Sequence, residues 1–165
     1  MRDYKVKPVV FAVMTVAAVA TAAGCNSGNS TGGFDVDRSF NIPLTTTEEV
    51  PTPKPSPATG TAEVVIYPQE IQYRLSATSM MNVIQAHIHV GAPGVAGPIV
   101  VGLFLSAAGG TGPISGQFAR GSITAGSLTA SVSLDSLKNL LKSGNSYVNV
   151  HTILNPAGEI RGQVR

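Results

Sequence analysis

Histidine offers the clearest chemistry in this sequence, and the chain has only three of them. His87 and His89 lie one residue apart in QAHIHVGAPG, and His151 lies in YVNVHT. Both stretches read as β-strands, so His87 and His89 should project from one face of a strand. Neutral imidazole is a ligand for copper and zinc, and His151 could supply a third ligand from an adjacent strand.

The residues around the histidines divide each strand into an apolar and a polar face. In YVNVHT, Tyr147 and Asn149 share a face with His151, while Val148 and Val150 take the other face. In QAHIHV the alanine, isoleucine and valine likewise lie opposite the two histidines. The histidines therefore lie on the outer side of a sheet, or in a buried polar layer if that side is covered.

The end of the chain can bring further polar groups to this face. Glu159 and Arg161 share a strand face in NPAGEIRGQV, and Asn-Pro-Ala-Gly before them is a turn signal. Two alternating segments around such a turn predict a hairpin. Glu159 and Arg161 would then lie beside Tyr147, Asn149 and His151. The alternative is a solvated Glu–Arg pair, worth about 0–1 kcal/mol.

Two interpretations of the histidines remain open. They form either a copper or zinc site, or a structural network with Asn149, Glu159 or backbone carbonyls. Both require convergence, so His87, His89 and His151 should lie within about 5–8 Å of each other. The chain has no serine elbow, paired carboxylates or phosphate loop of known spacing. No residue is predicted to be catalytic, and the protein is not expected to be an enzyme.

The elements that must position these residues are short and β-like. IQYRLSAT alternates between apolar and polar residues, and IVVGLFL (99–105) is an apolar run of the length of a buried strand. One segment differs, because SLDSLKNLLKSG repeats leucine at helical spacing, with Ser133 or Asp135 as a cap and Gly144 at the end. About seven strands and one short helix over residues 60–165 predict an all-β sandwich or barrel.

Residues 1–25 have the pattern of a secretory signal. A basic start is followed by an uncharged segment, Val9 to Ala23, and by Cys25. Ala-Ala-Gly-Cys resembles a bacterial lipobox, which predicts lipidation of Cys25, the single cysteine, and a membrane-anchored lipoprotein facing the extracytoplasmic side. The alternatives are a plain secretory peptide and a spanning anchor, although a spanning helix needs about 20 apolar residues.

Residues 26–59 are predicted to be a flexible tether. They are rich in Asn, Ser and Gly and then in Pro and Thr, ending near VPTPKPSP. This composition favours an extended, disordered linker. The net charge of +2 comes from the first 25 residues, and no basic stripe predicts a nucleic-acid partner.

AHIHVGAPGVAGPIVVGLF, GSITAG and YVNVHTILNPAGEIRGQV together resemble the CHRD domain, over most of residues 61–165. The resemblance implies an extracytoplasmic β-sandwich or barrel of immunoglobulin-like type, and the family has no established activity. His87-Ile88-His89 is similar to the copper-ligand pair of copper/zinc superoxide dismutases. The chain lacks their full two-metal ligand set and their disulfide, which argues against dismutase activity.

Two functional hypotheses follow. The first is a lipid-anchored CHRD module that binds an extracellular protein or envelope component, or has a structural role in the envelope. The second is a mononuclear copper or zinc protein that uses His87, His89 and His151.

Overall fold

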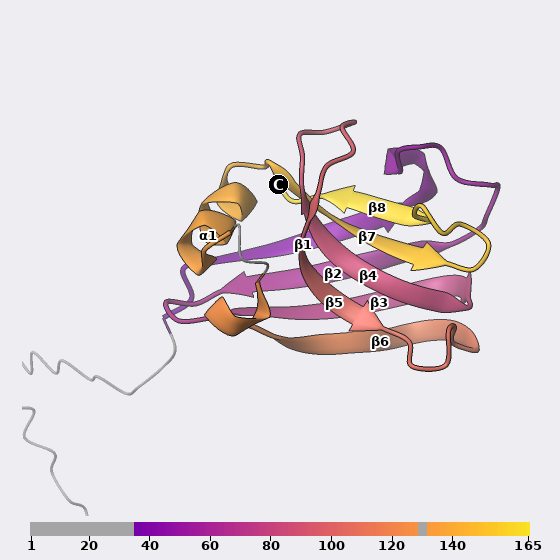
Figure 1. Cartoon of the computed structure of the whole chain (residues 1–165), viewed down its shortest axis with the longest axis horizontal. Coiled ribbons are helices and arrows are strands. Elements are labelled where there is room, and N and C mark those ends of the chain that lie inside the picture. Colours follow the sequence, from indigo (N-terminus) through magenta and orange to yellow (C-terminus); the bar gives the residue numbers. More distant parts are fainter. Residues whose placement is uncertain (1–34, 129–131) are drawn as a thin grey trace, which may run out of the picture. The chain divides into compact units, whose positions relative to one another are not determined.

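A computed structural model describes residues 35–128 and 132–165 of the chain. This part is an all-β fold with one short α-helix, as predicted (Figure 1). The helix is α1 (Leu134–Lys142), and two 3-10 turns are η1 (Thr46–Glu48) and η2 (Ala125–Ser127). The strands are β1 (Arg38–Thr45), β2 (Thr59–Ile66), β3 (Ile71–Met81), β4 (Val83–Val90), β5 (Ile99–Leu105), β6 (Pro113–Ile123), β7 (Ser146–Thr152) and β8 (Ile160–Gln163).

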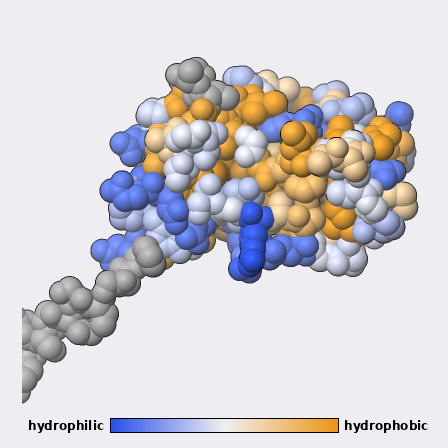
Figure 2. Space-filling model, turned by 60° about the horizontal axis from the view of Figure 1, so that its bottom comes forward, coloured by the Kyte–Doolittle hydropathy of each residue, from blue (hydrophilic) through white to orange (hydrophobic). Residues whose placement is uncertain are grey.

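The strands form one antiparallel sheet in the order β5-β4-β7-β8-β1-β2-β3-β6, and this sheet curls into a near-barrel. Side chains connect the edge strand β5 to the two strands at the other end of the sheet, β3 and β6. Tyr73 Oη on β3 donates a 2.6 Å hydrogen bond to the carbonyl oxygen of Leu103 on β5. The rings of Phe104 and Phe118 meet edge-to-face, with centroids 5.5 Å apart. Figure 2, turned so that the β6 side comes forward, shows hydrophobic residues across the middle of that face.

The interior of the curled sheet is the hydrophobic core. Every strand contributes at least one buried apolar side chain, and on β6 that residue is Ile123, at 1% exposure. Helix α1 packs Leu137 and Leu141 into this core. The helix begins as predicted, because Ser133 is the N-cap and its side chain accepts the Ser136 backbone N–H.

The expected tether, residues 26–59, is wrong at its C-terminal end. Residues 38–45 are β1, which pairs along its whole length with β2. Phe40, Ile42 and Leu44 are buried in the core. The domain therefore begins well before residue 60, because an alternating apolar strand lies within a segment of otherwise linker-like composition. Residues 26–34 and Cys25 lie outside the described residues.

Strand β5 also differs from its prediction as a buried strand. It is an edge strand in which Leu105 is 78% exposed, although Val100 and Val101 are buried. The hairpin of β7 and β8 is confirmed, with Tyr147 opposite Gln163 and Asn149 opposite Arg161.

Across residues 35–128 and 132–165, no helix has the length and apolar character needed to span a membrane.

Candidate metal centre

The three histidines converge on the outer side of β4 and β7, as predicted. Because β4 and β7 are antiparallel neighbours, His87 faces Asn149 and Gln85 faces His151. One ring nitrogen from each histidine lies within 4.8 Å of the others. The ring centroids are 5.0 Å apart for His87 and His151, 5.6 Å for His87 and His89, and 6.3 Å for His89 and His151.

Backbone carbonyls fix which nitrogen of two histidines carries the proton. His89 Nδ1 lies 2.8 Å from the carbonyl oxygen of Gly97, and His151 Nδ1 lies 3.1 Å from that of Pro156. A carbonyl oxygen only accepts, so each Nδ1 donates and each Nε2 of a neutral ring keeps its lone pair. His87 Nδ1 is 3.1 Å from His151 Nε2, so His87 is the donor of that hydrogen bond.

His89 Nε2 is a ring acceptor of this cluster left incomplete. It is buried and has no hydrogen-bond partner. Asn149 lies beside it and favours the charged form of the imidazole, but Asn149 Oδ1 is also buried without a partner. A buried acceptor without a partner costs about 1–3 kcal/mol. With the Asn149 amide oxygen in this orientation, the lone pair of His89 Nε2 has no hydrogen-bond donor among the described residues.

Burial keeps the three histidines neutral. They are only 8%, 7% and 6% exposed in chain order. Burial, and then the charges that His151 and His89 carry when protonated, lower the pKa of His87 from 6.5 to about 4. Burial also lowers the pKa of His89 and of His151. Neutral imidazoles can bind a metal ion without first losing a proton, so burial favours the form of these side chains that can act as ligands near pH 7.

The polar face of the sheet is covered, which makes it a buried polar layer. The 91–98 loop contributes the Gly97 carbonyl that orients His89. Gly97 N–H in turn donates a 3.0 Å hydrogen bond to Tyr147 Oη. The Tyr147 ring stacks on His89, with centroids 4.8 Å apart and the planes 10° from parallel. One histidine is thus held from two sides by a loop and a neighbouring ring.

Glu159 and Arg161 are both buried, but they do not pair with each other. Glu159 accepts hydrogen bonds from the hydroxyls of Ser56, at 2.5 Å, and Thr152. Arg161 donates to backbone carbonyls of the 91–98 loop. Glu159 and Arg161 therefore both belong to the buried polar layer, as predicted from the hairpin, but each has its own hydrogen-bond partners.

Sequence reasoning missed Glu49, which lies in the segment expected to be a tether. Its carboxyl group is buried, and burial raises its pKa from 4.5 to about 7. One carboxylate oxygen accepts the Val50 N–H at 3.0 Å, and the other has no partner. The alternation in RSFNIPL was the available signal, because it predicts a strand that ends a few residues before Glu49.

Solvent reaches the cluster from the side of β5. A hollow of about 400 Å³ is lined by His87 and by residues of β4 and β5, including Gln85 and Gly102. Gly102 is opposite His87 across the two strands, and a β-carbon there would meet no atom within 4 Å. The edge of His87 is therefore open to an incoming ion.

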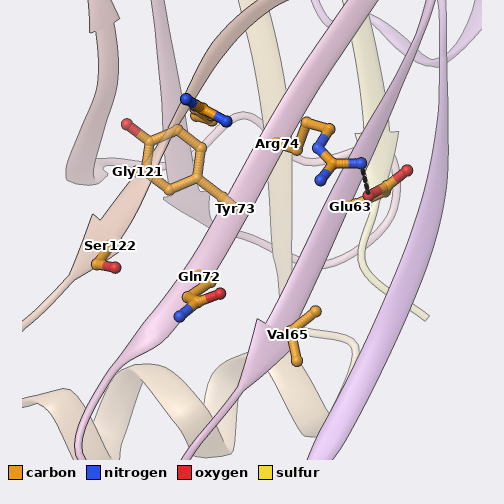
Figure 3. Close-up of a pocket in the computed structure, with 8 residues that line it drawn as sticks. Glu63, Val65, Gln72, Tyr73, Arg74, Gly121 and Ser122 are labelled. Atoms are coloured by element: carbon orange, nitrogen blue, oxygen red, sulfur yellow. Dashed lines mark ion pairs between the residues drawn. The ribbon is translucent and has the colours of Figure 1, made fainter.

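A second hollow, of about 440 Å³, lies on the outer face of β2, β3 and β6 and contains no histidine (Figure 3). Arg74 pairs there with Glu63 at 3.2 Å, and both side chains are about half exposed at 53% and 49%. An exposed pair of this kind contributes about 0–1 kcal/mol and binds nothing by itself. The chemistry of the described residues thus gathers at the histidines, not in this hollow.

No curated protein and no solved structure matches this chain. The family model described as the CHRD domain matches residues 40–164. That range begins within β1 and ends just after β8, so it includes the strand that sequence reasoning had assigned to a tether. By this match over most of its length, the chain belongs to the CHRD domain family.

Proposed function

We propose that this CHRD-domain protein binds a single copper or zinc ion through His87, His89 and His151. The observation that carries the proposal is the buried lone pair of His89 Nε2, which has no partner and lies in a cluster of ring nitrogens within 4.8 Å of one another. In a completed structural network that acceptor would be hydrogen-bonded, as buried polar groups are in most proteins. A metal ion supplies the missing partner.

The surroundings of the cluster support this role. Metal-binding histidines usually donate their other ring N–H to a carbonyl or carboxylate, which fixes the ring. His89 and His151 do so to Gly97 and Pro156. His87 would give up its hydrogen bond to His151 and offer the Nδ1 lone pair instead. A bound copper ion would supply Lewis acidity or one-electron chemistry, and the role proposed here is binding rather than catalysis.

The domain is proposed to act outside the cytoplasmic membrane. The signal-like residues 1–25 and the lipobox-like sequence before Cys25 support a lipid anchor at Cys25. The membrane is then one partner, and a role in copper handling at the cell envelope suits that location.

A second candidate function is a module that binds an extracellular protein or an envelope component. It is favoured by a hollow of about 440 Å³ at one end of the domain, lined in part by Met81, Ile153 and Leu154. These three apolar side chains are 56%, 59% and 47% exposed. The two candidates differ in whether the histidines hold metal.

Calorimetric titration of the full chain with Cu(II) and Zn(II) tests the proposal. The protein carries Cys25→Ser, so that the thiol cannot bind metal, and no histidine tag. We expect one ion per chain, with Cu(II) bound more tightly than Zn(II) as in the usual divalent order. His89→Ala should weaken binding on the order of 100-fold. Gln85→Ala, which changes the same hollow without removing a ligand, is the matched control.

Bound metal should also raise the melting temperature of the wild type and not of His89→Ala. Equal, weak binding by the wild type and His89→Ala would leave the histidines a structural role and favour the second candidate.

A further inference from the structure

A buried cation lies behind the histidine cluster. Arg161 is 1% exposed, and its guanidinium carbon lies 3.4 Å from the centroid of the Tyr147 ring. The same ring is stacked on His89 with the planes 10° apart. Arg161, Tyr147 and His89 therefore form one continuous stack from the guanidinium to a proposed metal ligand.

The charge of Arg161 has no carboxylate partner. Its Nη2 donates to the carbonyl oxygens of Ala92 at 3.3 Å and Val95 at 3.1 Å, and to Gln163 Oε1 at 3.3 Å. Nη1 is buried with no hydrogen-bond partner. None of the ion pairs between described residues includes Arg161.

The charge of Arg161 acts on the buried carboxyl group of Glu49, but Glu49 neutralises that charge only in part. Burial raises the pKa of Glu49 to about 7, although the charge of Arg161 acts to lower it. Near neutral pH a large fraction of Glu49 is therefore protonated and uncharged. A positive charge remains in the polar layer beside the histidines.

We propose that this site selects the singly charged ion Cu(I) over divalent ions, and that Arg161 is the specificity-determining residue that sets the preference. The inference rests on the proposed metal-binding function. It follows from the charges around the cluster, since the three ligands are neutral and a buried positive charge is stacked behind one of them through the Tyr147 ring. A carboxylate or thiolate, which would favour a divalent ion, is absent from the cluster.

The positive charge of Arg161 disfavours divalent ions more than it disfavours Cu(I). The repulsion between the guanidinium and a bound ion is proportional to the ion's charge, so it is twice as large for a divalent ion as for Cu(I). The cost of moving an ion from water into a buried site also rises steeply with charge.

Arg161 also has a positioning role, which an experiment must separate from its charge. By binding the Ala92 and Val95 carbonyls it holds the loop that carries Gly97, whose carbonyl orients His89. Loss of that support should weaken all ions alike. Loss of the charge should change the ratio of Cu(I) to Cu(II) affinity.

The test uses the full chain with Cys25→Ser and measures Cu(I), Cu(II) and Zn(II) affinities by competition, together with the midpoint potential of bound copper. The wild type should bind Cu(I) at least about 10-fold more tightly than Cu(II). Arg161→Met removes the charge and keeps much of the volume. It should lower the Cu(I)/Cu(II) affinity ratio about 10-fold, which is about 59 mV in potential.

Two variants serve as controls. Arg161→Lys keeps the charge and loses the planar contacts, so both affinities should fall while their ratio stays within about twofold. Arg74→Met removes an exposed guanidinium in the hollow without histidine and should leave the ratio unchanged.

The outcomes distinguish the inference from the proposed function. Failure of the wild type to bind any of the three ions overturns both. Tighter binding of Cu(II) than of Cu(I), or a folded Arg161→Met protein with an unchanged ratio, overturns the Cu(I) preference and leaves the metal site intact. If Arg161→Met does not fold, the ratio of the Cu(I) and Cu(II) affinities of the wild type alone decides whether the site prefers Cu(I).

Discussion

The carboxyl group of Glu49 packs against Gly158, in the space that a β-carbon at residue 158 would occupy. Gly158 has a φ of +137°, a conformation that residues with a side chain rarely adopt. It closes the turn of the β7–β8 hairpin, where its N–H donates a 3.1 Å hydrogen bond to the Asn155 carbonyl oxygen. The contact therefore joins the segment after β1 to the turn that also supplies the Pro156 carbonyl to His151.

Gly158→Ala should destabilise the domain by about 2–5 kcal/mol, because it combines backbone strain with an overpacked contact. The measurement is urea unfolding of the two proteins at pH 7. Gly112→Ala is the matched control, since a β-carbon there meets no atom within 4 Å. That control should change stability by less than about 0.5 kcal/mol. Equal effects of the two substitutions would show that Glu49 does not occupy the space beside Gly158.

Acid should destabilise the domain over a defined pH window. The pKa of all three histidines is lowered by burial, that of His87 to about 4. Between the unfolded pKa of about 6.5 and the folded value, the unfolded chain binds more protons, so the free energy of unfolding falls as pH falls. The lowered pKa of His87 alone would reduce the free energy of unfolding by about 3 kcal/mol between pH 8 and pH 4. Urea unfolding from pH 8 to pH 4 measures this, and His87→Gln should flatten the curve.

Glu49 should oppose the histidines in the same window. Its pKa is raised to about 7 by burial, so the folded state binds the extra proton between pH 4.5 and 7. That contribution to stability is complete below pH 4.5 and is lost as pH rises through 7. Glu49→Gln should therefore be more stable relative to the wild type at pH 8 than at pH 5. Glu63→Gln, on an exposed side chain, is the control and should show little pH dependence. A Glu49→Gln curve parallel to the wild type would contradict the raised pKa.

Cys25 is expected to carry lipid, because an uncharged segment ends there in small residues and the chain has no second cysteine. Cys25→Ser should lose incorporation of labelled fatty acid and move from the detergent phase to the aqueous phase after signal cleavage. Ser27→Ala, two residues away, should change neither. Unchanged detergent partition of Cys25→Ser would instead indicate an uncleaved membrane anchor.

The histidine cluster could be predicted from sequence because alternation along a strand places side chains two residues apart on one face. His87, His89 and His151 needed only the adjacency of β4 and β7 to converge. The β7–β8 hairpin was equally local, since its two alternating segments flank a single turn.

The cover over the cluster could not be predicted in the same way. The carbonyls of Gly97 and Pro156 belong to loops, and backbone groups carry no sequence signal of the partner they will meet. The partners of Arg161 could not be predicted either, since they are loop carbonyls and an aromatic ring instead of a carboxylate. The two-residue alternation of the strands predicted which face each side chain lies on. The hydrogen bonds of these side chains depend on how the loops with Gly97 and Pro156 fold over the sheet.

The segment that forms β1 was predicted to be part of a tether for a different reason. The linker-like composition of residues 26–59 was given more weight than the alternation of apolar residues within them. The strand lies between an Asn-, Ser- and Gly-rich segment and a Thr- and Pro-rich segment, both of which resemble linkers. Its inward residues, Phe40, Ile42 and Leu44, are nevertheless core residues that pack beside β2 and next to β8. This placement makes the N-terminal boundary of the domain testable.

A fragment of residues 60–165 should fail to fold, whereas residues 35–165 should fold. Each buried side chain of Phe40, Ile42 and Leu44 contributes about 1.5–3 kcal/mol. Their combined loss is comparable with the whole stability of a small domain, about 5–15 kcal/mol. Removing β1 also leaves the facing edges of β2 and β8 without hydrogen-bond partners.

Thermal melting by circular dichroism and the dispersion of amide NMR signals compare the two fragments. The longer fragment should melt cooperatively and bind metal as the full chain does. The shorter fragment also lacks Glu49, whose buried carboxyl group packs against Gly158 in the β7–β8 turn. A cooperative transition of residues 60–165 within a few degrees of the longer fragment would show that β1 is an accessory strand, and that the core closes without it.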